Sequence, residues 1–349
     1  MTRNSKEASK ISRVRDTTTY NALMRVIEER ARRVLEKFGQ AAISGVRDPT
    51  LLAVLNDVRS YWRDMYRPTL TMLSCEAVGG EPELVDKAGV MFTLASSGYG
   101  LHDDILDKST HKHLRMTIMG LHGLDSTLLV GDLLIAKAWT IVHEMIRQSS
   151  TPIKIAAIVE AYGNFSIEIC EAEFMETLCR RKLDTDLDFY KNVLWKAMAE
   201  MEACTRIGAI MGEGKTNEVE ALAEFGRRLG FMSRLADDVE DCLNIKGDLL
   251  HRIKYESVPF PLLYAAKYSR EKYRKIKKVI EKAQLTPLDA KTLLKSCFDT
   301  EAFEFVRRIA RKNEMMASRN LSLLRPSDAR NVLAVMNKKS YERIANLCI

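Results

Sequence analysis

Two short segments of the sequence carry three aspartates each, at the same spacing. The first segment, LHDDILD, holds Asp103, Asp104 and Asp107, and the second, DDVED, holds Asp237, Asp238 and Asp241. Positions i and i+4 share one face of a helix, so the first and last carboxylates of each segment can bind one cation between them. Three carboxylates so close together repel one another unless a cation neutralises them. Each segment is therefore predicted to bind metal, with all six aspartates as ligands.

Two such clusters facing each other would suit the chemistry of a diphosphate. Mg²⁺ prefers octahedral oxygen coordination and usually takes one or two carboxylates, with water and phosphate oxygens in the other positions. Shared ions would hold the diphosphate and stabilise the charge that develops when its carbon–oxygen bond breaks. His102, His111 and His113 around the first cluster leave zinc as an alternative, but oxygen ligands favour magnesium. We expect Mg²⁺, with up to three ions in the site.

The elements that must position these clusters are helices. Glycine and proline are sparse, at 17 and 8 in 349 residues, and apolar residues recur every three or four positions, as from Tyr20 to Phe38. Both clusters follow apolar helical stretches. The predicted fold class is all-α, a large antiparallel helical bundle around a central cavity. We expect a disordered segment over residues 1–18 and a single catalytic domain over 19–349.

Composition limits the kind of partner and the compartment. The formal charge is +7 and only 7% of residues are aromatic, so no nucleic-acid partner is predicted. Seven scattered cysteines without a Cys-x-x-Cys pair are typical of a reducing compartment. No run of 18 apolar residues occurs, so no transmembrane segment is expected, and the N-terminus lacks the apolar stretch of a signal peptide. These features predict a cytoplasmic protein.

One segment, residues 267–282 (KYSREKYRKIKKVIEK), is heavily basic. We interpret it as the solvated face of a helix that turns Tyr268, Ile276, Val279 and Ile280 inward. The alternative is binding to an anionic membrane surface.

With this order and spacing of motifs, the sequence resembles the trans-isoprenyl diphosphate synthases, the family of farnesyl and geranylgeranyl diphosphate synthases, over roughly residues 20 to 345. GDLL at residues 131–134 is similar to the family's Gly-Asp segment, and DLLHRIKYESVPFPLLY at 248–264 to a later one. The resemblance implies the isoprenoid synthase fold, a homodimer, and an allylic isoprenyl diphosphate as substrate. It also implies that Lys196 contacts this diphosphate, with help from Lys112 and Lys254.

The sequence departs from the family where the second substrate, isopentenyl diphosphate, would bind. In WRDMYRP the family's Arg67 and Pro68 are present, but Asp64 replaces a lysine, and Ser96 replaces a histidine. A family Arg-Arg pair reads Lys112-His113. Lysine keeps the charge without the bidentate fork, and neutral histidine keeps only a hydrogen bond.

Two further positions have open interpretations. Arg234 replaces a glutamine before the second cluster, and it either forms a salt bridge within the acidic cluster or contacts diphosphate. Tyr99, between Gly98 and Gly100, either packs in the core or limits the chain-elongation tunnel, since the resemblance places it on the helix that lines that tunnel. Glu171 and Glu173 are candidates for a role near the cavity.

Three functions remain compatible with this sequence. The first is Mg²⁺-dependent transfer of a prenyl group to isopentenyl diphosphate, giving a longer prenyl diphosphate. The second is cyclisation or quenching as in a terpene synthase, or prenylation of another acceptor, which the altered residues favour. The third is a non-catalytic subunit of a heteromeric prenyl synthase.

Overall fold

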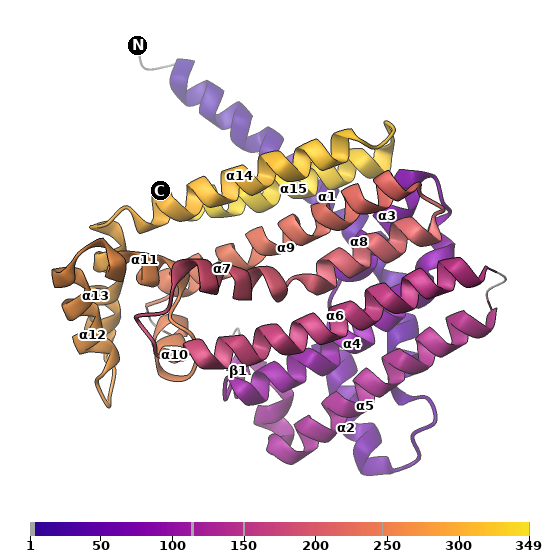
Figure 1. Ribbon diagram of the computed structural model, residues 1–349, viewed down its shortest axis with the longest axis horizontal. Coiled ribbons are helices and arrows are strands. Elements are labelled where there is room, and N and C mark those ends of the chain that lie inside the picture. The colour runs from indigo at the N-terminus through magenta and orange to yellow at the C-terminus, as the bar shows by residue number, and fades with distance from the viewer. Residues whose placement is uncertain (1–3, 113–114, 149–150, 246, 349) are drawn as a thin grey trace.

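The computed structural model describes the backbone of residues 4–112, 115–148, 151–245 and 247–348. Within these ranges the chain forms α-helices almost throughout, as predicted (Figure 1). The first half contains α1 (Asn4–Ile43), α2 (Pro49–Tyr61), α3 (Tyr66–Val78), a 3-10 turn η1 (Pro82–Val85), α4 (Asp86–Leu106), α5 (Ile118–Gln148) and α6 (Pro152–Cys179). Between α4 and α5, the two-residue strands β1 (His111–Lys112) and β2 (Arg115–Met116) pair antiparallel.

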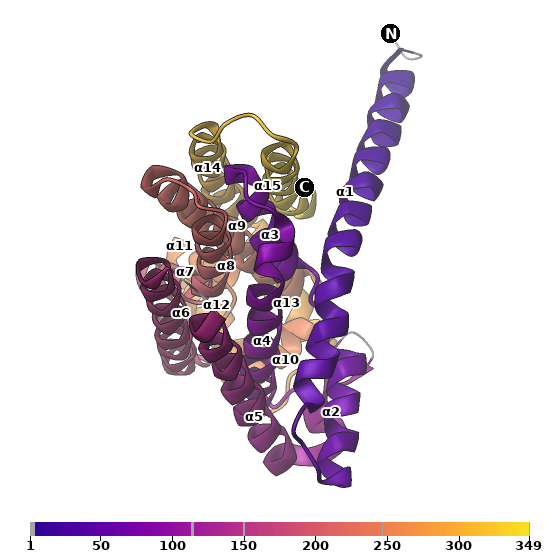
Figure 2. The ribbon, with the colours of Figure 1, turned by 90° about the vertical axis from the view of Figure 1, so that its right-hand side faces the viewer.

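The second half continues in the same way. It contains α7 (Leu187–Lys196), α8 (Ala199–Met211), α9 (Thr216–Leu243), α10 (Asp248–Tyr255), α11 (Phe260–Tyr268), α12 (Arg270–Ile280), α13 (Pro287–Phe298), α14 (Ala302–Ser322) and α15 (Asp328–Leu347). In the core of the bundle α4 packs on α5, α8 packs on α3, α6 and α9, and α14 and α15 cover α9. Figure 2 shows these helices running side by side.

Local sequence sets several helix boundaries. The Asp48 side chain caps α2 by accepting a hydrogen bond from the Leu51 amide at 2.8 Å, and Thr286 with Asp289 forms a capping box at the start of α13. Gly79 ends α3 with φ of 98°, in the left-handed region that favours glycine. Gly123 interrupts α5 with φ of 77°. Glycine therefore marks the end of α3 and the kink within α5.

Helix α1 begins earlier than the sequence suggested. It starts at Asn4 and so runs through most of the segment that was expected to be disordered. Figure 2 shows its first turns extending away from the rest of the bundle. The segment has no glycine or proline to stop a helix and several strong helix formers, which accounts for the difference. The domain boundary at residue 19 stays a prediction.

The two glycines around Tyr99 do not open a space. A Cβ on Gly98 would lie 2.7 Å from the carbonyl oxygen of Gly131 on α5, and a Cβ on Gly100 would meet the ring of Trp62. Glycine is required at both positions because neighbouring groups approach closely. The room beside Gly98 and Gly100 is thus filled by α5 and Trp62.

One surface helix departs from the prediction that no segment could span a membrane. Residues 118–147 of α5 are long and apolar enough to do so, and only 28% of the most apolar window is buried. Its exposed apolar side chains are Leu121, Leu124, Leu128, Leu129, Trp139 and Ile146. The sequence rule missed this helix because Asp125, Asp132 and Lys137 interrupt the apolar run. The finding is one of length and composition only.

Candidate active site

The first aspartate cluster lies at the C-terminal end of α4, where the β1–β2 hairpin folds back on it. The Lys112 Nζ atom, on β1, lies 3.0 Å from Asp103 Oδ2 and 2.7 Å from Asp104 Oδ1. Burial opposes the charge of Lys112, but the two carboxylates outweigh it and raise the lysine pKa. The hairpin therefore supplies one cation to two of the three aspartates. His113, the next predicted residue, lies outside the described residues.

The third carboxylate of this cluster has weaker compensation. Asp107 is the C-terminal cap of α4, and the nearest guanidinium nitrogen, from Arg180, is 3.7 Å away. Burial and the neighbouring carboxylates of Asp103, Glu256 and Glu176 raise the pKa of Asp107 to about 9. Burial and Asp103 likewise raise the pKa of Glu173, on α6, to about 8. Carboxylates from three parts of the chain thus crowd together with too few cations.

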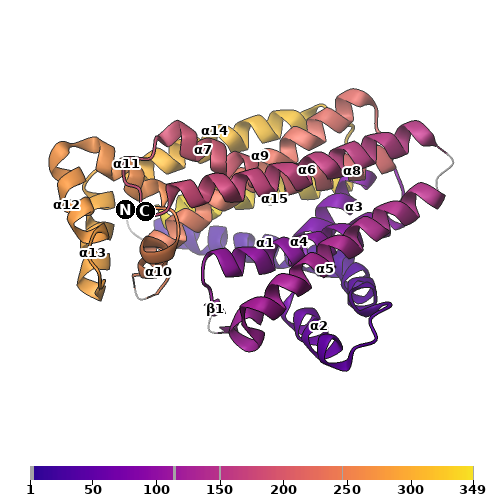
Figure 3. The same cartoon turned by 60° about the horizontal axis from the view of Figure 1, so that its bottom comes forward.

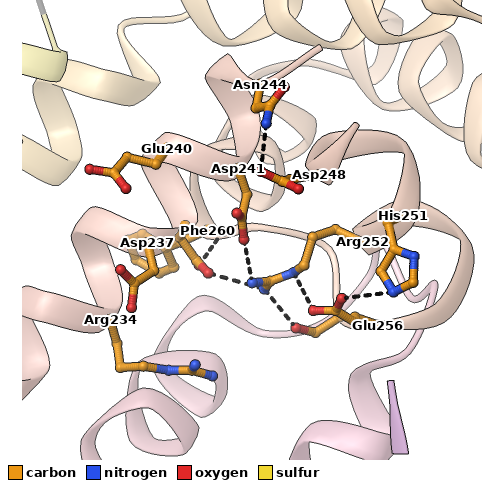
Figure 4. Close-up of polar contacts among 12 residues, drawn as sticks. Arg234, Asp237, Glu240, Asp241, Asn244, Asp248, His251, Arg252, Glu256 and Phe260 are labelled. Atoms are coloured by element: carbon orange, nitrogen blue, oxygen red, sulfur yellow. Dashed lines mark hydrogen bonds and ion pairs between the residues drawn. The ribbon is translucent and has the colours of Figure 1, made fainter. Parts of the chain in front are cut away.

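The second cluster has a different environment, in which Arg252 of α10 lies among the carboxylates (Figure 4). Asp238 is 1% exposed, and its two oxygens accept hydrogen bonds from Arg252 at 3.0 Å and from the Phe260 amide at 2.8 Å. Arg252 also donates to Asp241 at 2.8 Å. A second group of contacts joins this guanidinium to Glu256, Tyr190 and Ser257. Two of the three aspartates thus share one cation of the protein.

Asp237, the remaining aspartate, has a different cation as its partner. Its Oδ1 accepts a hydrogen bond from Arg343 of α15 at 2.8 Å, and the same guanidinium binds Glu240. Both partners are more than a third exposed. This pair is open to solvent, so a ligand or ion can compete with it.

The two clusters meet at one end of the bundle. Glu176 of α6 accepts hydrogen bonds from Arg234 at 3.2 Å and from Ser257 at 2.6 Å, which links α6 to the second cluster. His251 of α10 lies 3.0 Å from the backbone oxygen of Asp107. Glu256 is near enough to both sides that burial, Glu176, Asp103 and Asp241 raise its pKa to about 7 against the effect of Arg252. The tertiary structure therefore brings together two motifs about 130 residues apart.

Arg234 forms a salt bridge, but its partner lies outside the acidic cluster in which the salt bridge was predicted. Its partner is Glu176, which the sequence reading did not single out. Glu176 is one of five glutamates on α6, and only its hydrogen bond with Arg234 of α9 shows that it faces the site.

The predicted second-substrate residue Arg67 is held by two carboxylates. Its guanidinium donates to Asp64 at 2.9 Å and to Glu200 of α8 at 2.5 Å. Glu200 is buried, and burial raises its pKa to about 7 in spite of Arg67. Arg67, Arg234 and Asp237 line one cavity of about 890 Å³ together with α15. Asp64, the altered residue, also lines this cavity, and its carboxylate compensates much of the positive charge of Arg67.

The other predicted cations lie elsewhere. Lys196 pairs with Glu171 on α6 at 2.8 Å, and exposed Lys254 lies over the Tyr255 ring at 4.7 Å. Within the described part of the chain, neither lysine forms an ion pair with an aspartate of the two clusters. Their assignment to the allylic diphosphate therefore stays a prediction.

Tyr99 belongs to a group of aromatic rings between α4 and α6. Its ring meets Phe165 edge-on at 5.6 Å, and Phe165 in turn contacts Phe92 and Tyr162. The last three are buried completely or almost so. These four residues are called here the aromatic floor. Tyr99 thus packs against the core, and its role in limiting a chain-elongation tunnel stays a prediction.

The two clusters differ in how well they fit a metal ion. Among the described residues, no three acidic, histidine or cysteine side chains are already arranged as metal ligands. The first cluster nevertheless fits Mg²⁺, because Asp103 repels both Asp107 and Glu173, and a cation bound to these oxygen ligands would relieve that repulsion. At the second cluster only Asp237 fits, because Asp238 and Asp241 are bound to Arg252.

Known proteins of one family are similar to this chain. The family model for polyprenyl synthetase matches residues 56–297. The short chain isoprenyl diphosphate synthase of Methanothermobacter thermautotrophicus is 27% identical over 336 residues, which covers 89% of this chain and 98% of that protein. The geranylgeranyl pyrophosphate synthase of Geoglobus acetivorans is 25% identical over 328 residues, covering 91% and 98%.

Solved structures show the same fold. The geranylgeranyl pyrophosphate synthetase from Pyrococcus horikoshii superposes with a TM-score of 0.80 at 24% identity, over 93% of this chain and 99% of that one. A decaprenyl diphosphate synthase from Rhodobacter capsulatus superposes with a TM-score of 0.81 at 23% identity, over 93% and 99%. The predicted isoprenoid synthase fold is confirmed.

The family model and the relatives define a prenyltransferase of isoprenoid metabolism. The chain belongs to the polyprenyl synthetase family, as the family model shows. The resemblance read from the aspartate motifs and the prediction of an enzyme are both confirmed at this level.

Proposed function

We propose that this chain is a Mg²⁺-dependent trans-prenyltransferase that joins an allylic isoprenyl diphosphate to isopentenyl diphosphate. The observation that carries the proposal is the group of poorly compensated carboxylates at the first cluster, with the pKa of Asp107 raised to about 9. Such a group is costly without a cation and is suited to bind one. The second cluster faces it across the same end of the bundle.

In this proposal Asp103, Asp107 and Asp237 hold the metal, and Asp104, Asp238 and Asp241 hold the cations of the protein. This proposal narrows the six-ligand prediction to three residues, because Lys112 lies closer to Asp104 than to Asp103 and Arg252 binds Asp238 and Asp241. Bound Mg²⁺ would stabilise negative charge on the diphosphate. Lys112 and Arg234, next to the clusters, are placed to donate hydrogen bonds to the same group.

The reaction then follows from the chemistry of the two substrates. The carbon–oxygen bond of the allylic substrate breaks, and diphosphate leaves with the electron pair. The double bond of the acceptor attacks the allylic cation, a carbon–carbon bond forms, and a proton is lost to restore a double bond. Apolar side chains below the clusters exclude water, which would otherwise quench the cation.

The aromatic floor supports a short product. Tyr99 lies one helical turn before Asp103, and Phe165 packs against it from α6. A growing chain would have to displace buried rings, which removes favourable packing. We therefore propose products of the farnesyl to geranylgeranyl size, in line with the printed name of the Methanothermobacter relative, a short chain synthase.

A second candidate function has one specific observation in its favour. Arg67, the family residue for isopentenyl diphosphate, already has two carboxylate partners, Asp64 and Glu200. A diphosphate would have to compete with both, at an electrostatic cost. This arrangement favours prenylation of a less charged acceptor, or cyclisation or quenching of the allylic cation, at the same ionising site.

The exposed apolar face of α5 supports the predicted homodimer. Its exposed leucines form a row, whereas exposed leucines are usually scattered singly over a protein surface. Apolar patches of this kind mark interaction sites. Exposed Asp132 lies in the middle of α5 and pairs with His102, which disfavours burial in lipid. We propose that a second copy of the chain covers this face. All seven cysteines are free thiols, which supports the cytoplasm as the compartment.

Product analysis tests the two candidates directly. Dimethylallyl, geranyl, farnesyl and geranylgeranyl diphosphates are each incubated with the enzyme and Mg²⁺, with and without isopentenyl diphosphate, and all products are identified by mass spectrometry. Longer prenyl diphosphates formed only with isopentenyl diphosphate support the first function. Hydrocarbons or alcohols formed without it support the second. Full activity after complete chelation of divalent ions contradicts both, because both depend on metal.

A further inference from the structure

The net charge of the protein is concentrated in one small part of it. Residues 267–298, which we call the basic lobe, comprise the end of α11, α12 and α13. They contain ten lysines and arginines against three acidic residues, an excess of seven, and the formal charge of the whole chain is +7. The other residues are therefore balanced. Such concentration indicates a surface with an anionic partner.

The lobe presents its charges outward because the apolar side of α12 is used for packing. Ile276, Val279 and Ile280 are buried, as the sequence predicted. Tyr268 was predicted to turn inward as well, but it is 62% exposed. It is the last residue of α11, where the chain turns into α12, and so it falls outside the inward stripe.

About half of the cations in the lobe are not used in ion pairs. Four lysines pair with carboxylates: Lys267 with Asp186, Lys272 with Asp299, Lys277 with Glu281 and Lys282 with Asp289. Within the described structure, the following six exposed side chains have no ion-pair partner: Arg270, Arg274, Lys275, Lys278, Lys291 and Lys295. These six give the lobe an uncompensated positive surface.

Exposed apolar side chains accompany these charges. Besides Tyr268, Leu288 at the start of α13 is 72% exposed and Phe298 at its end is 53% exposed. Basic residues with scattered aromatic and aliphatic side chains are the composition of surfaces that lie on a bilayer, where apolar groups enter the headgroup region.

The lobe projects from the end of the bundle that carries the active site (Figures 1 and 3). Its helix α13 packs on α10, the helix of Arg252, and on α11, which provides the Phe260 amide. A surface bound by the lobe would therefore lie next to the two aspartate clusters.

We propose that the basic lobe docks this enzyme on the surface of an anionic lipid bilayer. Charge complementarity and the exposed apolar residues favour lipid over a nucleic acid, which would use aromatic stacking faces or a groove. The interaction is peripheral: headgroups attract the lobe, and Leu288 and its neighbours enter the interface. It does not depend on which acceptor the enzyme uses.

The test is flotation of the full-length protein with vesicles. One set contains phosphatidylcholine alone, and the other contains equal parts of phosphatidylcholine and phosphatidylglycerol. We expect binding only to the anionic set, with release at high salt because the charges are exposed. Binding that is equal on both sets overturns the proposal.

Charge reversal locates the docking surface. The triple variant Arg274→Glu, Lys275→Glu, Lys278→Glu should bind anionic vesicles more than a hundredfold more weakly, since each cation near such a surface contributes about fivefold. A matched triple variant with the same charge change, Arg47→Glu, Lys312→Glu, Arg319→Glu, reverses exposed cations outside the lobe and should bind at least tenfold more tightly than the lobe variant. Equal losses in both variants would mean a non-specific charge effect and would overturn the proposal.

Two competitors distinguish other sources of negative charge and another contact surface. Inorganic phosphate should not release the protein at equal ionic strength, whereas duplex DNA that competes as well as anionic vesicles would contradict a lipid surface. If the apolar face of α5 held the protein to vesicles, binding would survive both salt and the lobe variant. Soluble-substrate turnover should be unchanged in the lobe variant, because these three residues lie outside the catalytic site.

Discussion

The aspartate cluster at the end of α4 and the one on α9 share a spacing but differ in what neutralises them. In the first cluster, Lys112 forms ion pairs with Asp103 and Asp104, while Asp107 lacks a close cation. In the second cluster, Arg252 forms ion pairs with Asp238 and Asp241 in a buried network. The same motif can therefore bind an added cation in the first cluster and an arginine of the protein in the second.

The comparison also separates stability from catalysis. A buried carboxylate that loses its partner is left uncompensated, so the second cluster contributes to folding. A crowded carboxylate that lacks a partner lowers the stability of the folded protein, and other interactions of the fold offset this loss. Such a carboxylate is available to a ligand. We expect variants at the two clusters to fail in different ways.

The largest expected effect is on stability at the second cluster. Arg252→Met should lower the free energy of unfolding by about 3–5 kcal/mol, because it leaves Asp238 and Asp241 charged and buried without a partner. Urea denaturation followed by circular dichroism measures this loss. The variant Arg252→Met with Asp238→Asn and Asp241→Asn should recover part of it. A loss below about 1 kcal/mol would show that the network is solvated, and the contrast between the clusters would disappear.

The next effect is on catalysis at the first cluster. Asp103→Asn should reduce kcat/KM by about 10²–10³-fold, because an electrostatic contact to the leaving group is lost. Its unfolding free energy should change little, since removing one charge relieves repulsion with Asp107. Steady-state kinetics and urea denaturation are measured on the same preparation, with Asp184→Asn, an exposed aspartate away from the site, as the control. Near-normal turnover in Asp103→Asn would refute the metal assignment.

A smaller effect links pH to metal. The pKa of Asp107 is raised from 3.8 to about 9 and that of Glu173 from 4.5 to about 8. Between the low and the raised values, the unfolded chain binds fewer protons than the folded chain, so stability without metal should fall as pH rises through this range. Mg²⁺ binds the ionised carboxylates and should oppose the fall.

The corresponding measurement is the melting temperature with and without Mg²⁺ at mildly acidic and mildly alkaline pH. We expect a stabilisation of about 1–3 kcal/mol on the alkaline side at saturating metal, and less on the acidic side. Asp107→Asn should remove most of this pH dependence, whereas Asp241→Asn should retain the part that depends on metal. An equal Mg²⁺ effect at both pH values would contradict our account of the first cluster.

The smallest effect is expected for Arg343, the exposed partner of Asp237. Arg343→Met should cost less than about 1 kcal/mol of stability, since surface ion pairs contribute little. Compared with Arg252→Met, it isolates burial as the cause of the difference, because both arginines bind two acidic residues of α9. A loss as large as that of Arg252→Met would mean that burial is not the deciding factor.

Much of the architecture follows from local sequence. The three- and four-residue recurrence of apolar side chains marks the helices, and glycine and proline mark most of their ends, because both act within a few residues. The spacing of Asp103 with Asp107, and of Asp237 with Asp241, is likewise a local property of a helix face. These signals were sufficient for the fold class, the family and the two clusters.

Partner choice could not be read in the same way. Arg252 binds Asp238, Arg343 binds Asp237, and Glu200 binds Arg67. Sequence alone could not show which carboxylate each arginine binds, because other carboxylates lie at similar separations along the chain. An ion pair between two helices requires that they pack in one particular register. Glu176 was missed for the same reason.

By itself, the sequence determined that the protein is helical and has two aspartate clusters of equal spacing, since helix formation and side-chain spacing are short-range effects. The tertiary structure decided which cation pairs with each carboxylate, how Tyr99 packs, and where the net charge lies on the surface. Those outcomes depend on burial and on contacts between distant segments, which exist only once the chain has packed.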